Sequence, residues 1–201
     1  MVALVTVVLA RPRGARVISP PASPIEARIV EFARSQLGVR TDPPDTYCNP
    51  YSAFFGAGVA TGCAAGLRAE EWCADFAAWA WHEAGVPFTY GSGPGEIDGA
   101  AYSFYGYGLA HGTWHPLSSG YVPRPGDVAV YGLDRPAGTA VHVAVVTEML
   151  AGDRGPMVVN GDGSRTAFSI VETGSDQWKA DVHSDGAPLA GYVSPALPPH
   201  A

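Results

Sequence analysis

Hydrophobic positions follow helical spacing in two stretches of the first half of the chain. Around Ser23 the sequence has the pattern of a helix N-terminus, because the serine can cap free N–H groups and Glu26 completes a capping box. Apolar residues then recur every three or four positions until Gly38, which predicts a first helix. The same spacing in an alanine- and tryptophan-rich stretch predicts a second helix over about residues 71–84, ending at Gly85.

The second half of the chain has a different pattern, with short apolar runs separated by glycine- and aspartate-rich turns. These runs predict strands over residues 127–131, 141–147, 157–160, 168–171 and 189–193. Upstream, residues 39–68 are expected to form a loop region and residues 97–110 a weaker third helix. Helices first and antiparallel strands later indicate an α+β fold, with the helices packed on one sheet.

The N-terminal segment, residues 1–22, is expected to lie outside a single domain that spans residues 23–198. Residues 2–10 form an apolar run of the length of a signal-peptide core, but arginines follow it rather than precede it. Two interpretations stay open, a truncated or mis-started signal peptide and a short strand or apolar tail. The proline-bearing stretch of residues 16–24 predicts an extended linker.

Composition and charge exclude several classes of function. The chain has 201 residues, of which 47% are hydrophobic and 15% charged, as is typical of one globular domain. The formal net charge of −7 argues against nucleic acid and against an anionic membrane surface, since both require a basic face. We therefore expect no nucleic-acid or membrane partner, and a monomer.

The three cysteines divide into two and one. Cys48 and Cys63 lie in the predicted loop region, and an odd count in an exported protein suggests one disulfide and one free thiol. A Cys48–Cys63 disulfide is therefore predicted. Cys73 lies in the first turn of the second predicted helix, where exposed N–H groups and the helix dipole lower a thiol's pKa. By position alone it is either a nucleophile or a small buried core residue.

Two polar residues on predicted strands are candidate partners of Cys73. His142 interrupts a run of valines, and a polar ring inside such a strand needs a hydrogen-bond partner or a chemical role. Asn160 ends the next predicted strand. A hairpin turning around residues 151–152 would set His142 directly opposite Asn160, where the amide can fix the imidazole tautomer. A core histidine and a turn asparagine remain the alternatives.

Four segments in this order resemble the CHAP family, the cysteine, histidine-dependent amidohydrolases/peptidases. They are Glu71-Trp72-Cys73-Ala74-Asp75-Phe76, Pro125-Gly126-Asp127-Val128-Ala129-Val130, His142-Val143-Ala144-Val145-Val146 and Asn160-Gly161-Asp162. The resemblance implies a papain-like fold and a peptidoglycan hydrolase. It also implies Cys73 as nucleophile, His142 as general base and acid, and Asn160 as the residue that orients the imidazole, a position where many members carry Glu. Asp75 is expected to be structural, and Asp162 to support the site.

The resemblance implies a secreted or cell-surface cysteine hydrolase that cleaves amide bonds in peptidoglycan, either as an amidase or as an endopeptidase. The alternative is a catalytically weak or inactive module that binds a glycan or a protein partner. No cofactor is expected. No metal site is expected either, because His111 and His115 lack a third ligand at a suitable spacing. Aromatic residues of the segment 102–115 are expected either to line a substrate groove or to cover the core.

Overall fold

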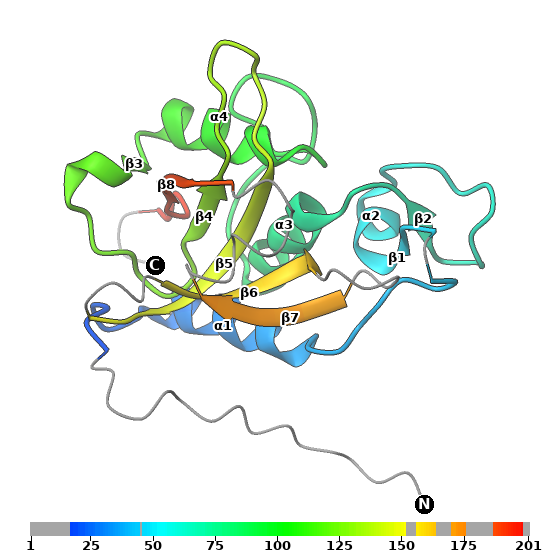
Figure 1. The fold of residues 1–201 in the computed structure, drawn as a ribbon, viewed down its shortest axis with the longest axis horizontal. Coiled ribbons are helices and arrows are strands. Elements are labelled where there is room, and N and C mark those ends of the chain that lie inside the picture. The colour runs from blue at the N-terminus through cyan, green and yellow to red at the C-terminus, as the bar shows by residue number, and fades with distance from the viewer. Residues whose placement is uncertain (1–16, 45, 152–155, 164–169, 176–186, 199–201) are drawn as a thin grey trace, which may run out of the picture.

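Three helices pack on one face of an antiparallel sheet (Figure 1). The computed structural model describes residues 17–44, 46–151, 156–163, 170–175 and 187–198. Helices α1 (Pro24–Ser35), α3 (Cys73–Ala84) and α4 (Ala101–His111) share a hydrophobic core with the central strands. The predicted α+β class is therefore confirmed, and all three predicted helices are present.

The sheet has six strands in the order β3-β8-β4-β5-β6-β7, and each neighbouring pair is antiparallel. All five predicted strands are present. The bounds are β3 (Trp114–Pro116), β4 (Val128–Tyr131), β5 (His142–Met149), β6 (Pro156–Gly163), β7 (Ile170–Ser175) and β8 (Leu189–Val193). The sequence did not predict β3, which is too short to show an alternating pattern. The first residues of the predicted strand 168–171 lie outside the described part.

Both faces of the central strands are buried, which explains why they are continuous runs of apolar residues. On β5, Val143 and Val145 face the helices, whereas Ala144 and Val146 belong to a second apolar cluster on the other face. This is the alternation that the sequence predicted. As the first residue of β5, His142 shares its parity with Ala144 and Val146.

The region expected to be a loop, residues 39–68, contains short elements. Helix α2 (Pro50–Phe55) begins where Asn49 accepts hydrogen bonds from two backbone N–H groups, and β1 (Cys48–Asn49) pairs with β2 (Arg68–Ala69). Both strands have only two residues, so no periodicity revealed them. The predicted Cys48–Cys63 disulfide is present.

The start of the described chain pairs with the sheet instead of forming a free linker. Val17 forms a bridge with Leu150, and the backbone N–H of Ile18 donates to the carbonyl of Met149 at 2.8 Å. Residues 1–16, on which the signal-peptide question depends, lie outside the described part. Among the described residues, no helix is long and apolar enough to span a bilayer.

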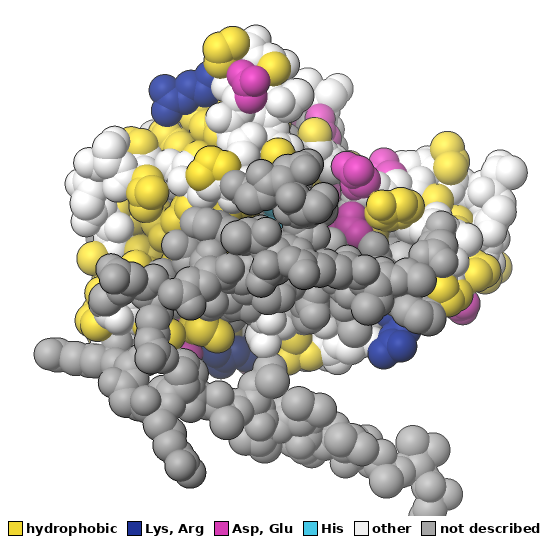
Figure 2. Space-filling model, in the orientation of Figure 1, with side chains coloured by type: hydrophobic (Ala, Val, Ile, Leu, Met, Phe, Trp, Pro, Cys, Tyr) yellow, Lys and Arg dark blue, Asp and Glu magenta, His cyan; other side chains and the backbone are white. Residues whose placement is uncertain are grey.

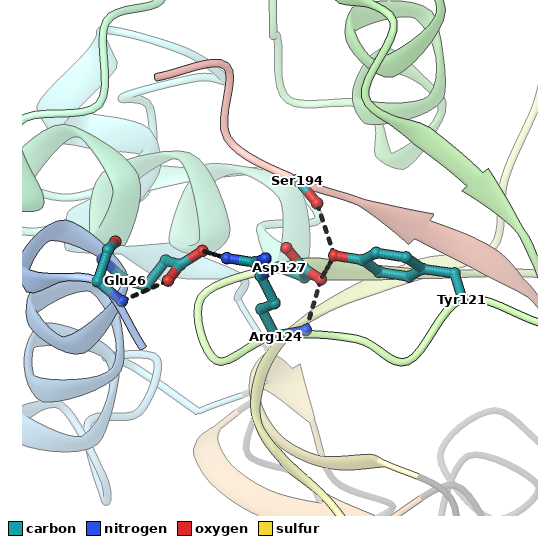
Figure 3. Close-up of polar contacts among 6 residues, drawn as sticks. Glu26, Tyr121, Arg124, Asp127 and Ser194 are labelled. Carbon is teal, nitrogen blue, oxygen red and sulfur yellow. Dashed lines mark hydrogen bonds and ion pairs between the residues drawn. The ribbon is translucent and has the colours of Figure 1, made fainter. Parts of the chain in front are cut away.

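A polar network in which Glu26 and Asp127 are buried joins the first helix to the sheet (Figure 3). The expected capping box of α1 is present, and its Glu26 forms an ion pair with Arg124 at 3.7 Å. The backbone N–H of Arg124 and the hydroxyl of Tyr121 donate to one oxygen of Asp127, at 2.8 and 2.9 Å. The Tyr121 hydroxyl also lies 3.1 Å from that of Ser194, just after β8. Burial raises the pKa of Asp127 to about 6.

Because the pKa of Asp127 is raised, its ionisation should lower the free energy of unfolding as the pH rises. Its folded-state pKa lies above the usual value of 3.8, so protonation favours the folded state, and that gain is lost as the pH rises from about 4 through about 6. The loss is of order 3 kcal/mol at most. Urea unfolding at pH 4.5 and pH 7 should show this slope in the wild type and a shallower slope in Asp127→Asn. Equal slopes for the two proteins would contradict the assignment.

Candidate active site

The first turn of α3 presents Cys73, the first residue of that helix, as the sequence predicted. The residue at the cap position, Trp72, supplies no capping side chain. A carboxylate from another element takes this role, because Asp162 of β6 accepts a hydrogen bond from the backbone N–H of Trp72 at 3.1 Å. The helix that carries the thiol is thus fixed to strand β6 at its N-terminal end.

Asp75 anchors the same turn from the inside. It is fully buried, and its two oxygens accept hydrogen bonds from the hydroxyls of Ser52, at 2.6 Å, and Tyr90. Ser52 belongs to α2, so Asp75 links two helices as well as occupying the first turn of α3. The expected structural role of Asp75 agrees with these contacts.

A second carboxyl group, Glu70, lies against Asp75. Burial, together with the hydrogen bond and the negative charge of Asp75, raises the pKa of Glu70 to about 8. Glu70 is therefore largely protonated at neutral pH and shares its proton with Asp75. No sequence signal indicates this pair, because nothing in the local pattern shows that Glu70 is turned inward.

His142 and Asn160 form a direct hydrogen bond. The Nε2–H of His142 donates to Oδ1 of Asn160 at 2.9 Å, and both side chains are buried. This contact fixes the ring orientation and makes Nδ1 the nitrogen available for proton exchange with a thiol or a substrate. The predicted partnership of these two residues is therefore present.

The predicted strand register was wrong, although the predicted contact forms. Val145 lies opposite Val159 and Val146 opposite Val158, which sets Asn160 level with Ala144 rather than with His142. A shift of two residues keeps every side chain on its original face, whereas a shift of one would invert them. His142 and Asn160 are consequently diagonal neighbours, close enough for a long side chain to bridge.

The segment Asn160-Gly161-Asp162 forms an irregular part of β6, where the pairing with β7 shifts. A side chain on Gly161 would place its Cβ 2.3 Å from the Cβ of Phe76, so only glycine lets the strand lie directly on α3. Asp162 adopts a left-handed backbone conformation with φ of 57°. This conformation directs its carboxylate towards Trp72, and the three residues thereby orient the histidine, contact the helix and cap it.

The sulfur of Cys73 meets the sheet one residue beyond His142. Its side chain is 6% exposed, and the backbone N–H of Val143 faces the sulfur and favours the thiolate. The site therefore lies where the N-terminal end of β5 meets the N-terminal end of α3.

The expectation of a lowered thiol pKa was wrong. Burial, with smaller contributions from the negative charges of Asp162, Glu71 and Asp75, raises the pKa of Cys73 to about 12. The helix N-terminus is surrounded by carboxylates, and these oppose the effect of its dipole. Cys73 is thus a neutral thiol in the resting protein.

The aromatic residues of the segment 102–115 mostly cover the core. Phe104 and Tyr107 are fully buried beside Trp81, whereas Tyr105 packs edge-on against the half-buried Trp114. This favours the core interpretation for the first two residues. Within the described part of the chain, no group of three histidine, cysteine or acidic side chains is arranged to hold a metal ion.

Comparisons with known proteins show which family the central part of the chain matches. The family model of the CHAP domain matches residues 65–162. Among solved structures, NlpC1 from Trichomonas vaginalis is similar, with 12% sequence identity and a TM-score of 0.44. That similarity covers 89% of this chain but only 46% of the NlpC1 chain. No curated protein matches the chain.

The match begins just before β2 and ends at Asp162, so it contains the thiol of α3 and the hydrogen-bonded pair of β5 and β6. Residues 65–162 therefore match the CHAP domain.

Proposed function

We propose that the protein is a cysteine hydrolase that cleaves amide bonds in bacterial peptidoglycan, as an N-acetylmuramoyl-L-alanine amidase or as an endopeptidase. The observation that carries the proposal is the His142–Asn160 hydrogen bond at the end of β5, beside the point where the Cys73 sulfur meets that strand. A general base held by a third residue, next to a nucleophile, is the arrangement that acyl transfer requires. The disulfide fits an oxidising, extracellular location.

The first half of the reaction forms a thioester. Since Cys73 rests as a neutral thiol, it transfers its proton to Nδ1 of His142 as its sulfur attacks the carbonyl carbon. The backbone N–H of Cys73, at the start of α3, stabilises the developing oxyanion. The C–N bond then breaks, and the imidazolium gives its proton to the leaving amine.

The second half regenerates the enzyme. His142 takes a proton from water, the hydroxide attacks the thioester carbon, and the C–S bond breaks. The products are a carboxylic acid, an amine and the Cys73 thiol, after the imidazolium returns its proton to the sulfur. Throughout, Asn160 holds the ring through Nε2 so that Nδ1 alone exchanges protons.

The primary test compares wild type with Cys73→Ala on purified peptidoglycan, with released products identified by mass spectrometry. We expect products from the wild type alone, because removing the sulfur removes the nucleophile. Stem peptides without muramic acid would identify an amidase, and shortened or un-crosslinked peptides an endopeptidase. Identical blanks from both proteins would contradict the proposal and favour a binding module, provided that circular dichroism shows both to be folded.

Replacing Asn160 should show whether this residue orients the His142 ring or contributes to substrate binding. Asn160→Ala removes the acceptor that fixes the His142 ring, so kcat should fall by about 10- to 100-fold while KM changes little. Asn160→Asp retains an acceptor oxygen and should keep more activity than the alanine variant. Equal kinetics for Asn160→Ala and the wild type would show that Asn160 does not position the imidazole.

The neutral thiol can be tested by alkylation. With a pKa of about 12 for Cys73, the rate of reaction with iodoacetamide should rise about tenfold per pH unit between pH 7 and pH 10, without a plateau. Asp162→Asn keeps an acceptor for the Trp72 N–H but removes a charge that raises this pKa, so its rate at a fixed pH should be higher. A plateau at or below pH 7 would instead indicate a standing thiolate–imidazolium pair.

A further inference from the structure

Two carboxyl groups converge on Gly99, in the loop that follows α3. A side chain at this position would place its Cβ 2.8 Å from Oε1 of Glu70 and 3.5 Å from Oδ1 of Asp75. Glu70 directly follows β2, and Asp75 lies in the first turn of α3, two residues after Cys73. The two carboxyl groups therefore meet where the chain enters the helix that carries the proposed nucleophile.

The hydrogen bonds around these groups favour a neutral Glu70. The hydroxyls of Ser52 and Tyr90 donate to the two oxygens of Asp75, so this group is satisfied as a carboxylate. Oε1 of Glu70 is buried and has no hydrogen-bond partner. A buried carboxylate oxygen without a donor is costly, whereas a protonated acid can donate a hydrogen bond of its own. Glu70 is thus placed to act as the acid that donates to Asp75.

The basic residue nearest to Glu70 in sequence, Arg68, offers little compensation for a negative charge there. Its guanidinium donates to the carbonyls of Ala57 and Gly58, at 2.5 and 2.6 Å, and its charge lowers the pKa of Glu70 by less than Asp75 raises it. On the face that Figure 2 shows, acidic side chains gather near α2, whereas Lys and Arg side chains lie at separate places away from them. An ionised Glu70 would therefore remain poorly neutralised.

The groups that face Glu70 from other elements are neutral or acidic. They are the hydroxyl of Ser52 on α2, the carboxylate of Asp75 on α3, and the phenol of Tyr90 in the loop after α3, where Asp98 adds a further negative charge. Burial, together with the hydrogen bond and the charge of Asp75, raises the pKa of Glu70 to about 8. As the pH rises through this value, two negative charges come to lie side by side, and the proton that joins them is lost.

Repulsion between these charges acts on the turn that presents Cys73. Asp75 is held by donors from α2 and from the loop after α3, so the segment between Glu70 and Cys73 is the part that gives way. We propose that Glu70 is a positioning residue, whose hydrogen bond to Asp75 holds the first turn of α3 in its reactive arrangement and whose ionisation loosens that turn and limits activity at alkaline pH. This inference rests on the proposed function, since it takes Cys73 as the nucleophile.

The turn can be followed without any hydrolysis. Hydrogen exchange of residues 74–80, expressed as protection factors that correct for the intrinsic pH dependence, measures how often this part of α3 opens. Because opening lets Glu70 ionise at its ordinary pKa, wild-type protection should fall at least tenfold between pH 6 and pH 8 and level off above pH 8. Glu70→Gln keeps a donor for Asp75 but has no proton to lose, so its protection should stay nearly constant. Equal pH dependence in the two proteins would overturn the inference.

Activity is the second readout. With a soluble peptide fragment of peptidoglycan as substrate, wild-type kcat should fall at least threefold between pH 7.5 and pH 9.5, with a midpoint near pH 8 and little change in KM. Glu70→Gln should keep its kcat over this range. Glu31→Gln, an exposed change of the same kind on α1, is the matched control and should retain the wild-type profile. An alkaline fall in kcat that persists in Glu70→Gln would overturn the positioning role.

A third variant tests the geometry and leaves Glu70 unchanged. Gly99→Ala would push the end of the Glu70 side chain away from Asp75, because the new Cβ would lie too close to Oε1. Glu70 should then ionise nearer its ordinary pKa, so the fall in protection between pH 6 and pH 8 should become at least threefold smaller. An unchanged pH dependence in this variant would contradict the contact. No hydrolysis by the wild type at any pH would overturn the proposed function, while the exchange data would still decide whether Glu70 holds the turn.

Discussion

The hydrogen bond from the backbone N–H of Trp72 to the carboxylate of Asp162 determines how the two halves of the site meet. Cys73 belongs to a helix, and Asn160 belongs to a strand 87 positions later in the sequence. Their relative placement therefore depends on tertiary contacts. Asp162, which follows Asn160 by two residues on β6, provides such a contact because its carboxylate caps the N-terminus of α3. The close contact of Gly161 with Phe76 allows the strand to approach the helix closely enough for this bond.

This arrangement has an electrostatic consequence. The carboxylate that places the thiol also disfavours its ionisation, and Glu71 and Asp75 act in the same direction. A base that accepts the thiol proton is therefore needed for the proposed reaction. The proposed role of the His142–Asn160 pair is to supply that base.

The helices and strands were predicted well from the sequence, because each signal for an element depends only on residues within or next to that element. The capping box at Ser23, the glycine after α3 and the valine runs of β4 and β5 depend only on neighbouring residues. Contacts between elements were harder to predict from the sequence. The hairpin register was wrong by two residues at the site because the strands pair about a later centre than the one predicted, and the bulge between Val146 and Glu148 offsets only one residue of that difference. The raised thiol pKa depends on burial and on charges from other segments.

The strand order also bears on how the molecule is assembled. Strand β8 lies between β3 and β4, so the sheet has a gap next to its centre until residues 189–193 have been made. Until then β3 has no neighbour in the sheet, β4 exposes an open edge, and Tyr121 lacks its contact with Ser194. Native closure of the sheet therefore requires β8, which makes folding of this domain a non-local event.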